Sequence, residues 1–144
     1  MADPLRTYIG PIQRILPLKK NQVLVFGSNT QGRHGKGSAK IASDYCGAKY
    51  GQAEGLQGQS WAIITKDLTV QKHPSRTKEQ IVQQIEKLYQ FAFNRPDLEF
   101  IVSYSGIGRN LNHYSPKDMG TMFYCAGSIP KNITFEEEFA KLVK

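Results

Sequence analysis

The chain has 144 residues, of which 19 are Lys or Arg and 12 are Asp or Glu, so its formal net charge is +7. This length suits one domain with a sizeable core, and 40% apolar residues are typical of a folded protein rather than a disordered one. No apolar run approaches the roughly 18 residues that a membrane-spanning helix needs, and the first residues lack the layout of a secretory signal. We therefore expect one domain over residues 1–144 without a membrane partner.

The positive charge is concentrated early in the chain. Residues 1–40 contain seven basic side chains and one acidic side chain, whereas residues 41–144 contain twelve basic and eleven acidic ones. A charge of +7 alone would suggest a nucleic-acid partner, but a local surplus suits a small anion as well. Composition leaves both partners open.

The two cysteines, Cys46 and Cys125, lie far apart in the sequence, without a CxxC pair or a histidine at a metal-ligand interval. A structural zinc site is therefore not expected, and we expect no bound metal or cofactor. Two reduced, partly buried thiols in a cytoplasmic protein are the expected alternative.

The first half of the chain predicts a strand, a loop, a helix and a second strand. Residues 1–20 contain scattered prolines and suit either a short edge strand or an extended arm. The apolar run at 23–26 predicts a strand buried on both faces. A glycine-rich loop follows, and a helix is predicted over about 38–46. Residues 61–64 predict a second buried strand.

The second half predicts further alternation of helices and strands. A capping box begins at Thr77, and the helix that follows ends before Pro96. Residues 100–102 predict a third buried strand, and Ser115 is a predicted N-cap with Pro at the first helical position. A last strand and a terminal helix are predicted over 133–135 and 136–144. This order predicts a three-layer α/β/α fold with a central mixed, largely parallel sheet.

Two of the three buried strands end in glycine-rich polar loops. Ligands of open α/β sheets bind at the carboxyl ends of the strands, where glycines expose backbone N–H groups and a helix N-terminus attracts anions. The first loop is not a Walker A motif, because Arg33 and His34 stand where Lys and Ser or Thr are needed. It is not a dinucleotide fingerprint either, because Lys40 replaces the third glycine.

Three blocks in this order resemble the macro domains, which bind and process ADP-ribose. The first is the strand and loop V-F-G-S-N (25–29) followed by G-K-G-S-A-K-I-A (35–42), the second is the strand G-Q-S-W-A-I-I-T (58–65), and the third is V-S-Y-S-G-I-G (102–108). The resemblance covers about residues 21–125 and is nearest to a small bacterial and phage branch with F-G-S-N-x-x-G-x-H-G-x-G and G-L-x-G-Q-S motifs. It implies a macro-like fold that binds ADP-ribose or a derivative.

The resemblance also implies a set of site residues. Asn29 matches the asparagine that contacts the distal ribose and helps to orient a water molecule, and we expect His34 to act as general acid or base beside it. The implied ligand-binding residues are Gly27, Ser28, Asn29, Gly35, Lys36, Gly37, Ser38, Ser105, Gly106, Ile107, Gly108, Arg109 and Asn110. The loop acid of many ADP-ribosyl hydrolases in the family is missing here, where His34 and Lys36 occupy that stretch, and the family's aspartate for the adenine amino group cannot be placed in this sequence.

Each of these residues also has a simpler interpretation. Asn29 could stabilise a turn, His34 could be solvent-exposed, and Arg109 could be a surface charge rather than a phosphate ligand. For several other polar residues the sequence leaves two interpretations open. His113 and Tyr114 either border the site or pack within a loop, and Gln57 and Gln59 either contact a ribose or are ordinary polar loop residues. His73 is expected in a linker, and the run Glu136-Glu137-Glu138 is expected at the exposed start of a helix.

Three functions follow as hypotheses. The first is hydrolysis of a terminal phosphate or an ADP-ribosyl linkage on bound ADP-ribose, and the second is binding of such a nucleotide without turnover. The third is non-specific nucleic-acid binding, which we rank last because no stripe of alternating aromatic and basic residues is present.

Overall fold

The structure is a computed structural model, and it describes residues 4–35, 37–104 and 113–144. Its strands are β1 (Arg6–Tyr8), β2 (Gln22–Asn29), β3 (Gly55–Gln57), β4 (Ser60–Lys66), β5 (Glu99–Val102) and β6 (Ile133–Glu136). Its helices are the short 3-10 helix η1 (Ile12–Arg14) and the α-helices α1 (Gly37–Tyr45), α2 (Lys78–Phe93), α4 (Pro116–Cys125) and α5 (Glu137–Ala140). The six strands form one sheet in the order β1-β6-β5-β2-β4-β3, parallel except for β3.

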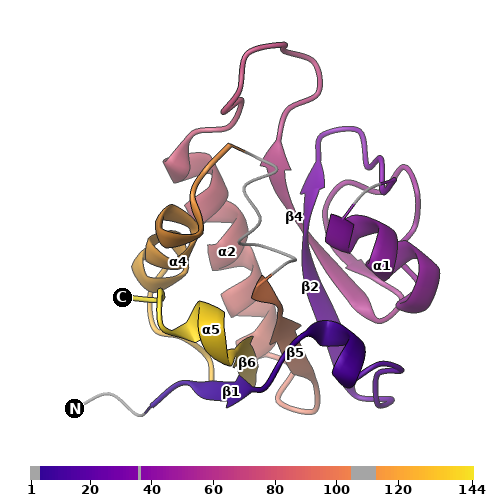
Figure 1. Cartoon of the computed structure of the whole chain (residues 1–144), viewed down its shortest axis with the longest axis vertical. Coiled ribbons are helices and arrows are strands. Elements are labelled where there is room, and N and C mark those ends of the chain that lie inside the picture. Colours follow the sequence, from indigo (N-terminus) through magenta and orange to yellow (C-terminus); the bar gives the residue numbers. More distant parts are fainter. Residues whose placement is uncertain (1–3, 36, 105–112) are drawn as a thin grey trace.

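Helices cover both faces of this sheet, as predicted. Figure 1 looks along the sheet, with α1 on one side and α2, α4 and α5 on the other. The side chains of β2 alternate between the two layers: Val23 and Val25 pack with α2 and α4, whereas Leu24 and Phe26 pack with α1. The three-layer α/β/α fold with a mixed, largely parallel sheet is therefore confirmed.

The two longest helices begin at the predicted residues. The Thr77 side chain accepts the backbone N–H of Gln80, and the Gln80 side chain returns a bond to the Thr77 N–H, which completes the capping box of α2. Ser115 caps α4 in the same way by accepting the N–H of Asp118. Because α2 buries Ile81, Ile85 and Leu88 completely, its amphipathic face fixes it across β4 and α4.

The chain leaves β2 and β5 in opposite directions. From β2 it crosses through α1 to β3 and β4, whereas from β5 it crosses through α4 on the other face to β6. Neighbouring strands with diverging connections form a topological switch point, and the crevice outside their carboxyl ends is where open α/β sheets bind ligands. The fold therefore places the switch point between β2 and β5.

Several element predictions need correction. The polar stretch before residue 60 contains the antiparallel strand β3, and the terminal helix is the single turn α5 rather than residues 136–144. The acidic run does start a helix as predicted, since Glu137 and Glu138 are exposed in the first turn of α5, but Glu136 is half-buried and is both the last residue of β6 and the N-cap of α5. Residues 1–20 contribute the edge strand β1, which pairs with β6, so the described part of this segment is not a detached arm.

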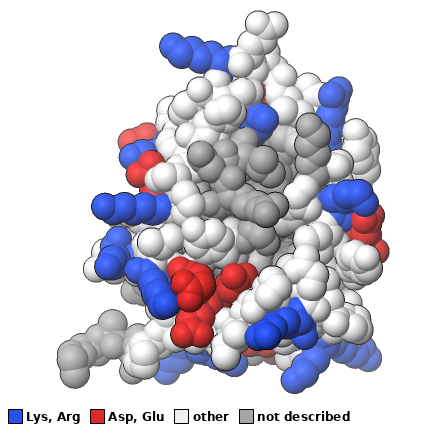
Figure 2. Space-filling view, viewed as in Figure 1, with Lys and Arg blue, Asp and Glu red and all other residues white. Residues whose placement is uncertain are grey.

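The surface carries its charges in scattered groups. In Figure 2, Lys and Arg side chains lie around the margin of the displayed face, and acidic side chains gather over α5. On the α1 surface, the ammonium group of Lys40 pairs with the Asp44 carboxylate at 2.6 Å, so this predicted surplus charge is partly neutralised. In the described residues, no helix has the length and apolar character that crossing a bilayer requires.

Candidate functional site

The switch point lies beside the last residues of β2. The ladder between β2 and β5 ends at Val25 and Val102, but β2 continues beside β4 as far as the pairing of Asn29 with Lys66. A register shift between Ser28 and Asn29 interrupts this ladder, and such irregularities redirect side chains at strand ends. The predicted residue Asn29 therefore stands at the carboxyl edge, in the position expected for a ligand contact.

The Asn29 side chain organises the loop that follows it. Its Oδ1 atom accepts the backbone N–H groups of Arg33 at 2.9 Å and Gln31 at 3.2 Å, and its Nδ2 atom donates to the Arg33 carbonyl at 2.9 Å. The turn-stabilising interpretation of Asn29 is therefore confirmed. An amide nitrogen carries two hydrogens, and the bonds of Asn29 to the described residues use one of them.

Glycines at two positions allow this loop to pack closely and to enter α1. Gly32 has a φ of +64°, and a Cβ atom on it would lie 2.5 Å from the carbonyl carbon of Gly51. Gly37 has a φ of +59° and is the first residue of α1. Both backbone conformations strongly favour glycine. The 29–35 loop is thereby pressed onto residues 51–52 while its end turns into the helix N-terminus.

His34 is buried beneath this loop, with 3% of its surface exposed. Its Nε2 atom lies 3.4 Å from the Ser28 hydroxyl, and its ring meets the Phe26 ring edge-on with centroids 5.1 Å apart. Its Nδ1 atom has no hydrogen-bond partner among the described residues. Burial lowers the pKa of His34, and the nearby backbone of Gln52 opposes this effect only in part. The solvent-exposed interpretation of His34 is therefore wrong.

This environment predicts a pH-dependent stability. Because the folded pKa of His34 is depressed, the unfolded imidazole takes up a proton first as the pH falls below about 6.5. We expect the melting temperature to decrease from about pH 7.5 to 5.5 and the His34→Gln variant to lose much of this dependence. Circular dichroism melts would measure it. His113→Asn is the control, since His113 is exposed; equal flattening in both variants would contradict the prediction.

The remaining predicted residues divide by exposure. Gly27 is half-buried on β2 and Gly35 is exposed, with nothing within 4 Å of the position of a Cβ atom on Gly35. Ser28 and Ser38 are buried at 4% and 6% exposure. The structure thus brings Gly27, Ser28, Asn29, His34, Gly35, Gly37 and Ser38 together at β2 and the start of α1. Lys36, Ser105, Gly106, Ile107, Gly108, Arg109 and Asn110 lie outside the described residues.

A pair of histidines adjoins this edge. The rings of His73 and His113 stack with centroids 5.0 Å apart and planes inclined by 18°. Next to them, the Tyr114 hydroxyl donates to the Arg76 carbonyl at 2.6 Å, which ties the segment before α4 to the segment before α2. The linker interpretation of His73 missed this contact, because sequence spacing carries no signal for two segments 40 positions apart.

A carboxylate stands at the other end of the carboxyl edge. The Glu136 Oε1 atom accepts the Tyr104 backbone N–H at 3.1 Å and the Tyr8 hydroxyl at 3.4 Å. Burial and the Glu136 charge raise the pKa of Tyr8, so its hydroxyl stays protonated and donates. The interpretation of Glu136 as part of an exposed acidic run concealed this role.

Other candidates serve the fold. Gln57 is buried and bonds the backbone of Lys49 and Gln52, and Gln59 bonds the carbonyls of Lys19 and Gln22 at the opposite edge of the sheet. Gln59 is therefore not a ribose contact at the carboxyl edge.

The thiols differ from each other. Burial raises the pKa of the Cys46 thiol to about 11, whereas Cys125 is exposed rather than partly buried. Both are free. Within the described ranges, no three His, Cys, Asp or Glu side chains come together in a way that could hold a metal ion.

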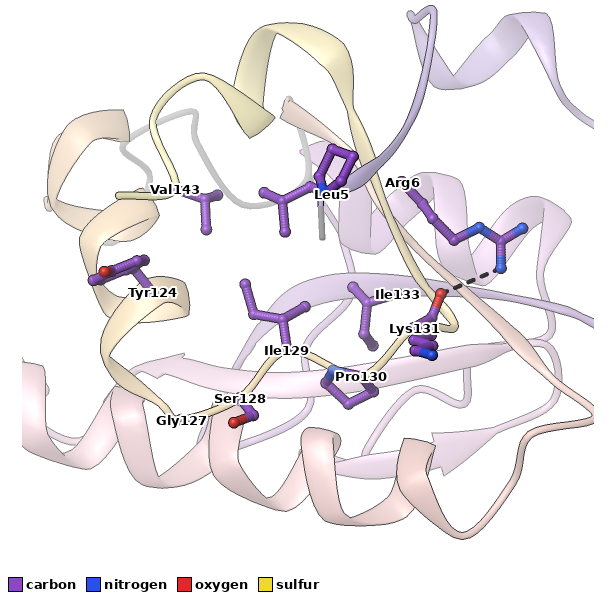
Figure 3. Close-up of a pocket in the computed structure, with 11 residues that line it drawn as sticks. Leu5, Arg6, Tyr124, Gly127, Ser128, Ile129, Pro130, Lys131, Ile133 and Val143 are labelled. Atoms are coloured by element: carbon purple, nitrogen blue, oxygen red, sulfur yellow. Dashed lines mark hydrogen bonds between the residues drawn. The ribbon is translucent and has the colours of Figure 1, made fainter. Parts of the chain in front are cut away.

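The structure also contains a cavity that the sequence did not indicate. It measures about 860 Å³ and lies between β1, the end of α4 and the start of β6, at the amino edge of the sheet. Figure 3 shows Leu5, Tyr124, Ile129 and Val143 around its apolar interior. The Arg6 guanidinium points away from this interior and donates to the Lys131 carbonyl. No predicted site residue that the structure describes lines this cavity.

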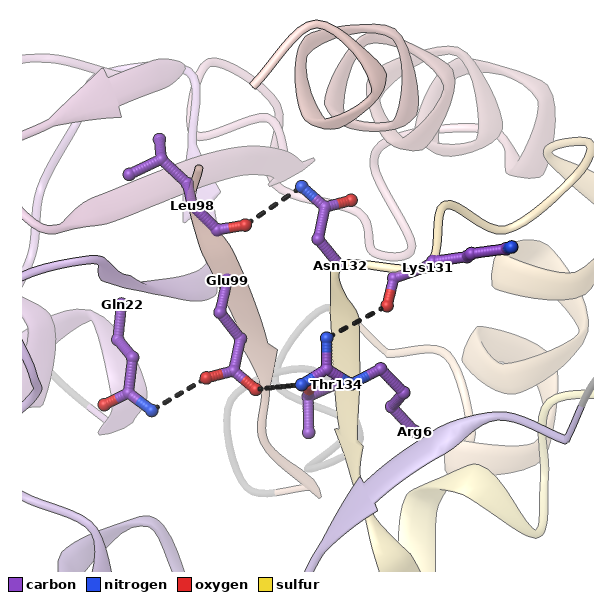
Figure 4. Close-up of polar contacts among 7 residues, drawn as sticks. All are labelled: Arg6, Gln22, Leu98, Glu99, Lys131, Asn132 and Thr134. Atoms are coloured by element: carbon purple, nitrogen blue, oxygen red, sulfur yellow. Dashed lines mark hydrogen bonds and ion pairs between the residues drawn. The ribbon is translucent and has the colours of Figure 1, made fainter. Parts of the chain in front are cut away.

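The amino edge also holds a polar network that connects four strands. Figure 4 shows the Glu99 carboxylate between Gln22, Thr134 and Arg6, at distances of 2.9, 2.8 and 3.4 Å. Burial would raise the pKa of Glu99, but these hydrogen bonds and the nearby Arg6 and Lys19 charges together lower it. Because Arg6, Gln22 and Thr134 from three other strands already bind it, the Glu99 carboxylate has a structural role.

No protein-family model matches this chain. No curated protein matches it either. A function for this chain must therefore rest on the residues and geometry at the carboxyl edge of the sheet.

Proposed function

We propose that this chain binds ADP-ribose or a close derivative in the crevice between the carboxyl ends of β2 and β5. The observation that carries this proposal is the switch point itself. The chain connections after β2 and β5 diverge there, and each of the two strands is followed by a glycine-rich loop in the sequence. The three blocks that resemble macro domains contain β2, β4 and β5 and the loops after β2 and β5. The α/β/α layers agree with that family, so we propose that the chain is macro-domain-like.

The diphosphate would lie over the N-terminus of α1. The first backbone N–H groups of a helix lack intrahelical partners, and the helix dipole adds positive potential there. Gly35 and Gly37 let a phosphate approach the backbone, since neither residue carries a side chain. No acidic residue lies in the first turn of α1, whereas α2 and α4 carry Glu79 and Asp118 there. This difference favours an anion at α1.

The distal ribose would meet Asn29. The remaining Nδ2 hydrogen of Asn29 can donate to a ribose hydroxyl, while the three bonds within the loop hold the amide in place. Because the Asn29 amide is already held in place, less conformational entropy is lost when the ligand binds.

The geometry supports binding more than turnover. His34 was the expected general acid or base, but it is buried under the loop and its Nε2 faces Ser28. A general acid must reach the proton that it transfers directly or through one water molecule. We therefore propose a binding module or sink for an ADP-ribose-type nucleotide. The free thiols of Cys46 and Cys125 support a cytoplasmic location.

The test is isothermal titration calorimetry with ADP-ribose, ADP and a short DNA duplex, followed by chromatography of the ADP-ribose and ADP-ribose-1″-phosphate recovered after incubation. We expect ADP-ribose to bind in the micromolar range, about −8 kcal/mol, more tightly than ADP, and to be recovered unchanged. Hydrolysis of ADP-ribose-1″-phosphate would favour the enzymatic hypothesis over binding without turnover. Absence of ADP-ribose binding, or DNA binding that is equally tight and steeply salt-dependent, would refute the proposal.

A further inference from the structure

The stacked pair of His73 and His113 lies outside the proposed ADP-ribose contacts. His73 belongs to the connection from β4 to α2, and His113 belongs to the segment that enters α4. Both segments lead into helix N-termini, which lie side by side because Lys78 at the start of α2 pairs with Asp118 at the start of α4, at 3.7 Å.

The charged neighbours of the pair favour an anion. Lys66, the last residue of β4, is near enough to lower the pKa of His73, although burial contributes more to that decrease. No described carboxylate forms an ion pair with Lys66. The nearby Asp67 acts in the opposite direction, but its Oδ1 atom already accepts bonds from Thr69 and Thr30.

The other charged groups around the pair balance one another in part. Hydrogen bonds from Thr69 and, to a smaller extent, the Arg76 charge lower the pKa of Asp67. Burial and the charges of Glu79 and Asp118 raise the pKa of Tyr114. Asp118 is itself paired with Lys78. Among the described residues, the two imidazoles, the Lys66 ammonium and the Arg76 guanidinium, whose buried Nε atom has no hydrogen-bond partner there, are left as groups that could donate to an anion.

The hydrogen bonding of His73 tolerates both of its protonation states. Its Nδ1 atom lies 2.9 Å from the Ser75 hydroxyl, which accepts the Asp67 backbone N–H at 2.8 Å. The Ser75 hydroxyl can donate its hydrogen to a neutral Nδ1 or accept the N–H of an imidazolium with its second lone pair. His73 can therefore gain a proton without losing this partner.

We propose that His73, His113 and Lys66 form a proton-coupled binding site for a phosphate-type dianion, either inorganic phosphate or the phosphate end of a larger molecule. A dianion beside the pair stabilises the imidazolium form, so binding takes up a proton. The site goes beyond the proposed ADP-ribose contacts and can be measured without ADP-ribose.

The test is an NMR titration of the imidazole Cε1–H signals with inorganic phosphate at constant ionic strength, between about pH 5.5 and 8. The chain has only three histidines, so single substitutions assign every signal. We expect phosphate to raise the pKa of His73 and to move the Cε1–H signal of His113 while leaving the signal of buried His34 in place. If phosphate changes neither the pKa of His73 nor the signal of His113, the proposal is wrong.

Variants separate a specific site from a general charge effect. We expect Lys66→Gln and His113→Asn to weaken phosphate binding at least about threefold; asparagine suits the φ of +68° at position 113. The matched control is Lys20→Gln, which removes one exposed cation before β2, at the opposite edge. An equal loss in Lys20→Gln would overturn the proposal.

A final titration, with ADP-ribose present, identifies the ligand that fills the site. If the phosphate-induced shifts persist with saturating ADP-ribose, free phosphate or another molecule fills the site; if they disappear, the site takes the phosphates of the nucleotide. Because inorganic phosphate is measured alone first, failure of ADP-ribose binding would refute the proposed function without affecting this result.

Discussion

Replacing Gly32 by alanine is expected to destabilise the fold by about 3 kcal/mol, which corresponds to a decrease of roughly 10 °C in melting temperature. A Cβ atom at this φ of +64° is strained in itself. It would also lie 2.5 Å from the Gly51 carbonyl carbon and 2.7 Å from the Gln52 nitrogen, which are backbone atoms that cannot rotate away. The 29–35 loop would have to lift from residues 51–52 and uncover His34.

Gly51→Ala is the matched control for this substitution. Gly51 also has a positive φ, +94°, but nothing lies within 4 Å of the position of its Cβ atom. Its replacement should therefore cost only the conformational part, about 1 kcal/mol. Thermal and urea unfolding of both variants would measure the difference. Equal stability of the two variants would mean that the packing of the loop against residues 51–52 contributes nothing.

Replacing Asn29 by alanine is expected to reduce the affinity for ADP-ribose by about 30-fold or more, an effect of about 2 kcal/mol. The substitution removes the donor that we assign to the ribose. It also removes the three bonds that hold the loop before α1, so the backbone groups that would meet the diphosphate lose their fixed positions. Calorimetry with ADP-ribose at a temperature well below the melting point would measure the loss.

Asn132→Ala is a close control, because Asn132 also makes three hydrogen bonds. Its Nδ2 atom lies 3.0, 2.9 and 3.0 Å from the carbonyl oxygens of Ala92, Arg95 and Leu98, so its two hydrogens are shared among three acceptors. Figure 4 shows it beside Leu98, just before β6 and far from the carboxyl edge. Its loss should destabilise the fold without changing the affinity for ADP-ribose. If both variants bind ADP-ribose as the parent does, Asn29 has only a structural role.

The sequence predicts those parts of the fold whose signals are local. The unbroken apolar run that begins at Val23 can only be buried between two layers, and the reciprocal bonds between Thr77 and Gln80 need only four consecutive residues. The strand β3 was missed because Gly55, Leu56 and Gln57 have no strand pattern of their own. They form a strand because they pair with Ser60, Trp61 and Ala62 of the next strand.

The candidate site shows the same division. The glycine-rich loop and its position at the end of β2 follow from the sequence, since a buried strand must end where polar residues and glycines begin. The burial of His34 does not follow, because it depends on residues 51–52 packing over the loop. The contacts of His73 with His113 and of Glu136 with Tyr104 join segments distant in the chain, and a single sequence carries no signal for such contacts.

The pairing of β1 with β6 has a consequence for how the protein is made. Tyr8 pairs with Glu136, which the ribosome adds 128 residues later. At synthesis rates of about 5–20 residues per second, β1 waits roughly 6–25 seconds for its partner. The ladders that pair β2 with β4 and β5 need no later segment and can form during that time, whereas the layer around Val23 and Val25 is completed only when α4 follows. We therefore expect the N-terminal strand β1 to join the sheet after the pairing of β2 with β4 and β5 has formed.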